Sequence, residues 1–123
     1  MTSLPPRQLA CLVDIFNSVQ AIHRYVAGQT REQFMEDSKT QDAVLRRFLV
    51  AGEAAARLTV ETCNQLPDIP FGKIAGMRNR VVHDYGNVDF EIVWETIHRH
   101  LPLLFDELRR FLAECGESRG LTD

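Results

Sequence analysis

Apolar residues recur every three or four positions over most of this chain, which is the spacing of an α-helix with one buried face. The pattern covers residues 4–26, 40–58 and 89–112, with a shorter stretch around Phe34. No segment alternates apolar and polar residues as a half-buried strand does, and no repeat or linker divides the 123 residues. The sequence therefore predicts an all-α, antiparallel up-and-down bundle of about five helices. It forms one domain over residues 1–115, with a flexible tail over residues 116–123.

Capping and helix-breaking residues mark the expected helix ends. Thr30 followed by Gln33 is a capping-box pattern, and Gly28 is suited to end the helix before it. The run 66–70 contains two prolines, so a further helix should begin at residue 70 or 71. The remaining expected boundaries are N-caps at Thr40 and Asp89, a left-handed cap at Gly86 and a kink at Pro102.

Composition and charge narrow the class of protein. Hydrophobic content of 45% and charged content of 25% are those of a globular chain, and no apolar run is long enough to cross a membrane. The N-terminus lacks a signal-peptide pattern. The three widely spaced cysteines form no CxxC pair, and no Asp, Glu or His cluster has metal-ligand spacing. We expect a cytoplasmic protein without metal or cofactor.

The net charge of −3 argues against a general nucleic-acid coat protein, so any contact with RNA or DNA must use a local basic patch. The candidate cations are Lys73, Arg78 and Arg80, joined by Arg46 and Arg47 or by the run 98–100. The last two groups are equally consistent with ordinary solvated helix surface.

The segment 76–86 concentrates the chemically useful side chains. Helical phasing places Arg78 inside an apolar stripe, where a guanidinium needs a partner, and Glu53 among small residues is the expected one. Arg78 is then either a buried strut or part of a site, and Arg80 is the alternative phosphate-facing cation. Asn79 and His83 fall on the opposite face, four residues apart.

Gly72 and Gly76 lie on that same opposite face and leave it bare. Small residues at this spacing allow another backbone to approach, either from a second copy of the chain or from a helix of the same chain. His83, near a helix end, suits a general acid or base, and Tyr85 should expose its hydroxyl. Five residues separate Arg78 from His83, or about 140° around a helix. Either Arg78 reaches round, the helix end unwinds, or a second chain completes the site; we favour the second chain.

The pattern Arg78-Asn79-x-x-x-His83-x-Tyr85 resembles the Arg-x4-His-x-Tyr motif of HepT-like toxins, a branch of the HEPN superfamily of helical ribonucleases. Similar segments occur in order from residue 8 to 112, among them 40–44, 52–54, 66–70 and 89–94. Phe71 departs from the family, in which many members have tryptophan.

The resemblance implies a toxin that cuts RNA without a metal, as a homodimer with both motifs at the interface. It implies Arg78 and His83 as catalytic residues, Asn79 as a supporting residue and Tyr85 as the target of AMPylation by a small nucleotidyltransferase (MntA-like) antitoxin. Transfer RNA and messenger RNA are both open as substrates. The chemistry is coherent, since His83 can move the proton of an attacking 2′-OH while Arg78 or Arg80 stabilises the phosphorane.

Two other interpretations stay open. The same face can belong to a non-catalytic HEPN module that binds a nucleotide or a partner protein without cleaving RNA. It can also belong to a helical dimerisation protein held by a buried Arg78–Glu53 pair.

Overall fold

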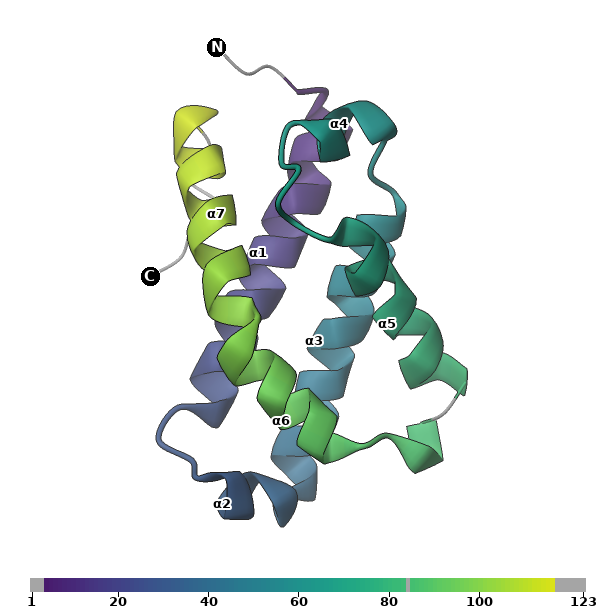
Figure 1. Cartoon of the computed structure of the whole chain (residues 1–123), viewed down its shortest axis with the longest axis vertical. Coiled ribbons are helices and arrows are strands. Elements are labelled where there is room, and N and C mark those ends of the chain that lie inside the picture. The colour runs from purple at the N-terminus through teal and green to yellow at the C-terminus, as the bar shows by residue number, and fades with distance from the viewer. Residues whose placement is uncertain (1–3, 84, 117–123) are drawn as a thin grey trace.

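The computed structural model describes residues 4–83 and 85–116, with the side chains of all of these except 81–83 and 85. These residues form seven α-helices and one 3-10 helix, and none of them lies in a strand. The helices are α1 (Pro6–Val26), α2 (Arg31–Met35), α3 (Ser38–Ala56), α4 (Val60–Asn64), α5 (Phe71–His83), η1 (Tyr85–Asn87), α6 (Phe90–Arg99) and α7 (Leu101–Glu114). The long helices alternate in direction, so the all-α bundle is confirmed (Figure 1). None of the described helices is both long and apolar enough to span a membrane.

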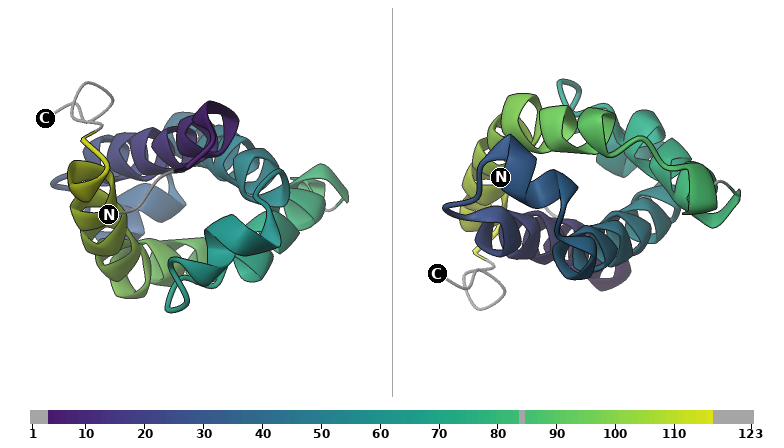
Figure 2. Two further views of the ribbon diagram at one scale, coloured as in Figure 1. Left: turned by 90° about the horizontal axis from the view of Figure 1, so that it is seen from above. Right: turned by 90° about the horizontal axis from the view of Figure 1, so that it is seen from below.

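The core lies between α1, α3 and the α6–α7 arm. Helix α3 packs against α1 on one side and α5 on the other, whereas α7 packs on α1. Seen from above and below, α1 and α3 form one flank and α6 lies on the opposite one (Figure 2). Their facing positions follow the predicted spacing of three and four, and the fully buried side chains include Leu12, Ile15, Phe16, Ile22, Phe34, Val44, Ile97, Leu108 and Leu112.

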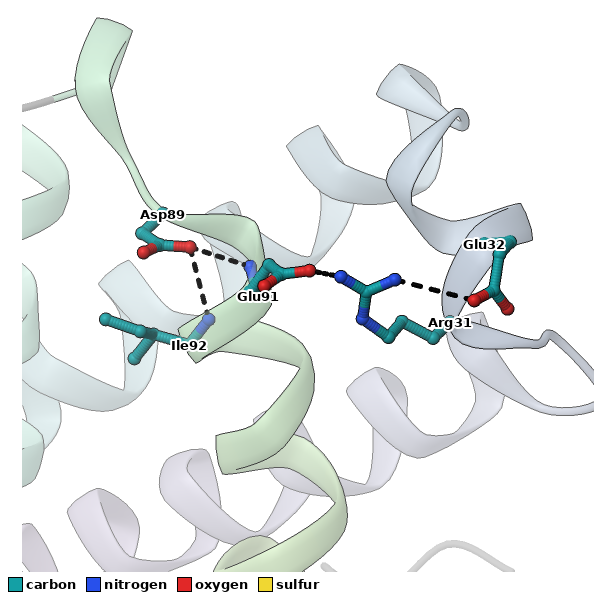
Figure 3. Close-up of polar contacts among 5 residues, drawn as sticks. All are labelled: Arg31, Glu32, Asp89, Glu91 and Ile92. Carbon is teal, nitrogen blue, oxygen red and sulfur yellow. Dashed lines mark hydrogen bonds and ion pairs between the residues drawn. The ribbon is translucent and has the colours of Figure 1, made fainter.

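Most helix ends are set by local polar groups. Thr30 and Gln33 form the expected reciprocal capping box, and Gly28 follows α1 with a φ of 78°. The Asp89 carboxylate caps α6 as predicted, accepting from the backbone N–H of Glu91 at 2.9 Å (Figure 3).

Thr40 is not the cap of α3, so that prediction is wrong. Asp37 is the N-cap, and its carboxylate accepts both the Thr40 backbone N–H at 3.1 Å and the Thr40 hydroxyl at 2.6 Å. The two residues are three apart, so either could begin a helix there. The charged carboxylate is the stronger acceptor, and it takes both donors of Thr40.

Three other boundaries differ from the expectation and raise the number of helices above about five. The helix around Pro102 is not kinked but divided, because proline fits the first turn of α7, where no N–H is needed. Thr59 caps the extra helix α4. Gly86 lies within η1 and is not a left-handed cap; among the described glycines, positive φ occurs at Gly28 and Gly116.

Helix α2 holds the start of α6, directly after the motif segment. The Phe34 ring packs edge-on against Phe90 and at a tilt against Trp94, with ring centroids 6.1 and 5.3 Å away. On the surface, Arg31 forms an ion pair with Glu91 of α6 (Figure 3). The chain is therefore fixed on both sides of residues 84–87, by α5 before them and by α6 after them.

Candidate functional site

The motif residues are carried by α5, which starts directly after Pro70 as predicted. Phe71 is buried, and Ile74 and Met77 are half-buried, so the helix is held by its apolar side. The α-helix continues without a break to His83. Unwinding of the helix before His83 is therefore not how Arg78 and His83 could come together.

Helix α5 approaches α3 most closely at Gly52. A methyl group placed on Gly52 would lie 2.7 Å from the Arg78 Cβ, 3.1 Å from the Ile74 carbonyl oxygen and 3.2 Å from the Arg78 backbone nitrogen. No real Cβ tolerates the first of these distances. The lack of a side chain at residue 52 thus allows the motif helix to lie this close to α3, and a larger residue at that position would force the two helices apart.

Arg78 is not buried, contrary to the expectation from helical phasing. Its side chain is exposed, and Nη1 donates to the Asn79 Oδ1 at 3.4 Å. The expected partner Glu53 is also exposed and lies 4.0 Å from Arg57, one turn further along α3. Phasing located the Arg78 Cβ correctly beside α3, but the long side chain extends past Gly52 into solvent.

The hydrogen bond from Arg78 to Asn79 turns the guanidinium towards the other face of α5. Of the three ways in which Arg78 and His83 could serve one site, this geometry is compatible with Arg78 reaching round the helix. The side chain of His83 lies outside the described residues, as do the side chain of Tyr85 and all of Asp84. Their backbone positions place His83 at the end of α5 and Tyr85 at the start of η1.

The glycine face of α5 is open. Gly72 and Gly76 are exposed, and a Cβ added to either meets no atom of the described chain within 4 Å. The interpretation that a helix of the same chain packs here is therefore wrong. The second interpretation, that another copy of the chain packs here, is left as a prediction.

A cleft of about 660 Å³ lies between α5 and the α6–α7 arm, and Gly76 of the open glycine face is among the residues that line it. Its floor is apolar and is formed by α1 and α3. Lys73, Met77 and Arg80 line it from α5. The two motif-region arginines thus differ in surroundings: Arg78 lies beside α3, whereas Arg80 lies at the cleft. Sequence reasoning missed the cleft, because five helices build it and no single segment contains its signal.

The other basic groups are mostly engaged locally. His98 stacks on Trp94 with ring centroids 4.0 Å apart, and Arg99 pairs with Glu95 at 3.3 Å. Arg47 donates to the Tyr25 hydroxyl oxygen at 3.4 Å. His100 differs, since it lines the cleft together with Arg80.

The remaining titratable groups of interest lie away from the motif helix. Burial lowers the pKa of His23, which packs edge-on against Phe105 and has no hydrogen-bond partner at Nε2 among the described residues. Burial also raises the thiol pKa of Cys11, Cys63 and Cys115, so all three stay protonated near neutral pH. The described residues contain no group of three or more His, Cys, Asp or Glu side chains able to hold a metal ion.

Comparison with known proteins decides the family. The family described as Ribonuclease HepT-like matches residues 15–112, which include the whole of α5. The chain belongs to the HepT-like ribonuclease family.

Relatives in this family cover nearly the whole chain. The "Probable ribonuclease HepT" of Thermococcus cleftensis is 32% identical over 102 residues, covering 80% of this chain and 93% of that protein. "Putative RNase MJ0127" of Methanocaldococcus jannaschii is 30% identical over 112 residues, covering 90% of this chain and 93% of that protein. No solved structure matches the chain. The family match thus covers residues 15–112, and Arg78, Asn79, His83 and Tyr85 all lie within it.

Proposed function

We propose that this HepT-like chain is the toxin of a prokaryotic toxin–antitoxin system and cleaves RNA without a metal ion. The observation that carries the proposal is the family match over residues 15–112. Within this region, Arg78 and Asn79 are exposed on the motif helix and are connected by a hydrogen bond. An exposed arginine and amide are accessible to a phosphodiester, whereas a buried strut would not be.

The proposed reaction is attack of the ribose 2′-OH on the adjacent phosphate. His83 accepts the 2′-OH proton or delivers a proton to the leaving 5′ oxygen. Arg78 stabilises the charge that develops on the phosphorane, with Arg80 as a second cation, and Asn79 orients the guanidinium or the phosphate. The P–O5′ bond breaks as the P–O2′ bond forms, leaving a 2′,3′-cyclic phosphate and a 5′-hydroxyl.

A homodimer is part of the proposal. The open face at Gly72 and Gly76 gives a second copy of the chain a place to approach α5 closely. Its two-fold axis would then bring the motif of one protomer beside that of the other. Arg78 and His83 are five residues apart, which is about 140° around a helix. A dimer would let Arg78 of one protomer act with His83 of the other.

The proposed regulation is AMPylation of Tyr85 by a nucleotidyltransferase antitoxin. An adenylate adds a negative phosphate and a bulky base two residues from His83, where both would exclude RNA. Mass spectrometry after co-expression with the neighbouring gene product tests this step. A mass increase that persists in Tyr85→Phe, or no increase at all, would refute the assignment of Tyr85.

The cleavage reaction is tested with purified protein, single-stranded RNA and EDTA. We expect cleavage in EDTA that leaves cyclic phosphate ends and is lost in His83→Ala and in Arg78→Ala. Arg110→Ala is the matched control, because Arg110 is an exposed arginine on α7 outside the motif and the cleft. Cleavage that survives His83→Ala, or that EDTA abolishes, would contradict the mechanism.

A further inference from the structure

The cleft between α5 and the α6–α7 arm has the size and composition of a ligand site. Its volume of about 660 Å³ lies within the roughly 300–1,000 Å³ usual for small-molecule pockets. The floor consists of Ile15, Val19, Phe48 and other side chains of the core. Two large apolar side chains at the cleft, Ile92 and Leu103, are 54% and 69% exposed. These are apolar surfaces that the described chain leaves uncovered.

Charged groups are distributed unevenly along the cleft. Helix α5 descends and α6 ascends in the view of Figure 1, so the end of α5 and the beginning of α6 lie at the same end of the bundle. Arg80 belongs to the last turns of α5 and Ile92 to the first turn of α6, and both line the cleft. The carboxylates Asp68 and Glu107 belong to the loop before α5 and to α7, at the other end. Lys73 lies between them and Arg80 along α5. Neither Lys73 nor Arg80 forms an ion pair within the part of the chain that the structure describes.

The motif and the cleft are close enough to bind the same nucleotide. Arg80 follows Arg78 by two residues, about 3 Å along the helix axis but about 200° around it. The Arg78 guanidinium bends away from α3 to donate to Asn79 Oδ1, and Asn79 directly precedes Arg80 on the helix. A phosphate held at the motif would therefore lie next to the Arg80 end of the cleft. Proteins that read single-stranded RNA commonly splay a base out of the stack into a pocket, against apolar side chains or an arginine plane.

We propose that this cleft binds one unstacked nucleobase of the RNA substrate, next to the phosphate that is cleaved. The proposal rests on the proposed ribonuclease function and assigns the base-reading part of that site. Met77, Ile92 and Leu103 provide the apolar surfaces for the base, and Arg80 neutralises the adjoining phosphate. At the far end, Asp68 and Glu107 accept hydrogen bonds from an exocyclic amino group. Uracil lacks such a group, so the cleft should favour the other three bases.

The test measures RNA binding separately from cleavage. His83→Ala protein is titrated with short single-stranded oligomers of uridine, cytidine, adenosine or guanosine, and fluorescence anisotropy gives each Kd. We expect oligouridine to bind most weakly. Adding Leu103→Glu should weaken binding of the other oligomers roughly tenfold and remove the difference from oligouridine.

Val60→Glu is the matched control, because Val60 is 72% exposed, lies outside the cleft and receives the same change of charge. It should leave both the Kd values and the base preference unchanged. Thr96→Leu is a second, uncharged variant: Thr96 is half-buried on α6 at the cleft, and a bulkier aliphatic side chain there narrows the cleft without adding an aromatic ring on which a base could stack. Its effect should match that of Leu103→Glu.

Three results would overturn the inference. The first is equal binding of all four oligomers by His83→Ala protein, and the second is a base preference that persists in both cleft variants. The third is a change from dimer to monomer in Leu103→Glu, seen by light scattering, since the cleft would then be a subunit interface. Failure of the proposed function would look different, because wild-type protein would then cleave none of the oligomers whatever its binding preference.

Discussion

Gly52→Ala is the substitution for which the structure gives the sharpest expectation. The added methyl would meet the Arg78 Cβ at 2.7 Å and two backbone atoms of α5 at 3.1 and 3.2 Å. Ordinary carbon contacts need about 3.5–4.0 Å, so α5 must retreat from α3 by roughly 1 Å. None of the three atoms is the free end of a flexible side chain, and the helix as a whole has to move.

Two opposing free energies set the size of the effect. Overpacking a tight contact costs about 1–3 kcal/mol, whereas replacing glycine by alanine within a helix contributes about 1 kcal/mol of stability. We expect Gly52→Ala to lower the free energy of unfolding by about 1 kcal/mol, as the balance of these effects. Because α5 carries Arg78, a shift of this size could also reduce RNA cleavage up to about 100-fold.

Urea denaturation followed by circular dichroism measures the change, and Gly76→Ala is its control. Gly76 is also within a helix, but a Cβ there meets no described atom within 4 Å. That variant should gain about 1 kcal/mol in dilute protein, so the two alanine variants should differ by about 2 kcal/mol. If Gly52→Ala is as stable as Gly76→Ala, the added methyl group meets no steric barrier between α3 and α5, and the reasoning from the close contact at Gly52 is refuted.

Three further predictions concern the scaffold. Burial lowers the pKa of His23 below its ordinary 6.5, so the unfolded chain takes up the proton first. The free energy of unfolding should be highest above about pH 6.5 and should fall as the pH drops below that value. Urea midpoints measured against pH would show this slope, and His23→Gln should remove it. Asp89→Ala removes the cap of α6 and should lower the free energy of unfolding by about 1 kcal/mol, with Asp89→Ser recovering most of it. Arg31→Ala breaks only exposed ion pairs, with Glu91 and Glu32, and the same denaturation assay should show a loss below about 1 kcal/mol.

The parts of the fold that the sequence predicts are those decided by neighbouring residues. The capping box at Thr30 and the cap at Asp89 each need partners within three positions, so both are visible in the sequence and both are confirmed. The prediction of Thr40 as the N-cap of α3 was wrong, because Asp37, three residues earlier, caps the helix instead. At Pro102 the sequence shows that the helix is disturbed, but whether it bends or restarts depends on how α6 and α7 pack.

The site was predictable in position and less so in geometry. Helical periodicity predicts the direction of a Cβ atom, and it correctly placed the Arg78 Cβ beside α3. It does not predict where the end of a long side chain lies. The open face at Gly72 and Gly76 was visible as a pattern, but only the folded chain excludes an internal partner. The cleft is built by residues as distant as Phe48 and Leu103, which no local pattern connects.

The contact at Gly52 also bears on how mutational data for this family should be interpreted. A screen for loss of ribonuclease activity would score residue 52 among the most sensitive positions, although it lies on α3 and carries no side chain. Its substitution acts on geometry, because the added atoms would meet the Arg78 Cβ and backbone atoms of α5. A second change could suppress it only by letting α5 as a whole pack further from α3. Substitution of a residue that contacts RNA could not be rescued in that way, so suppressor selection would separate the two kinds of sensitive position.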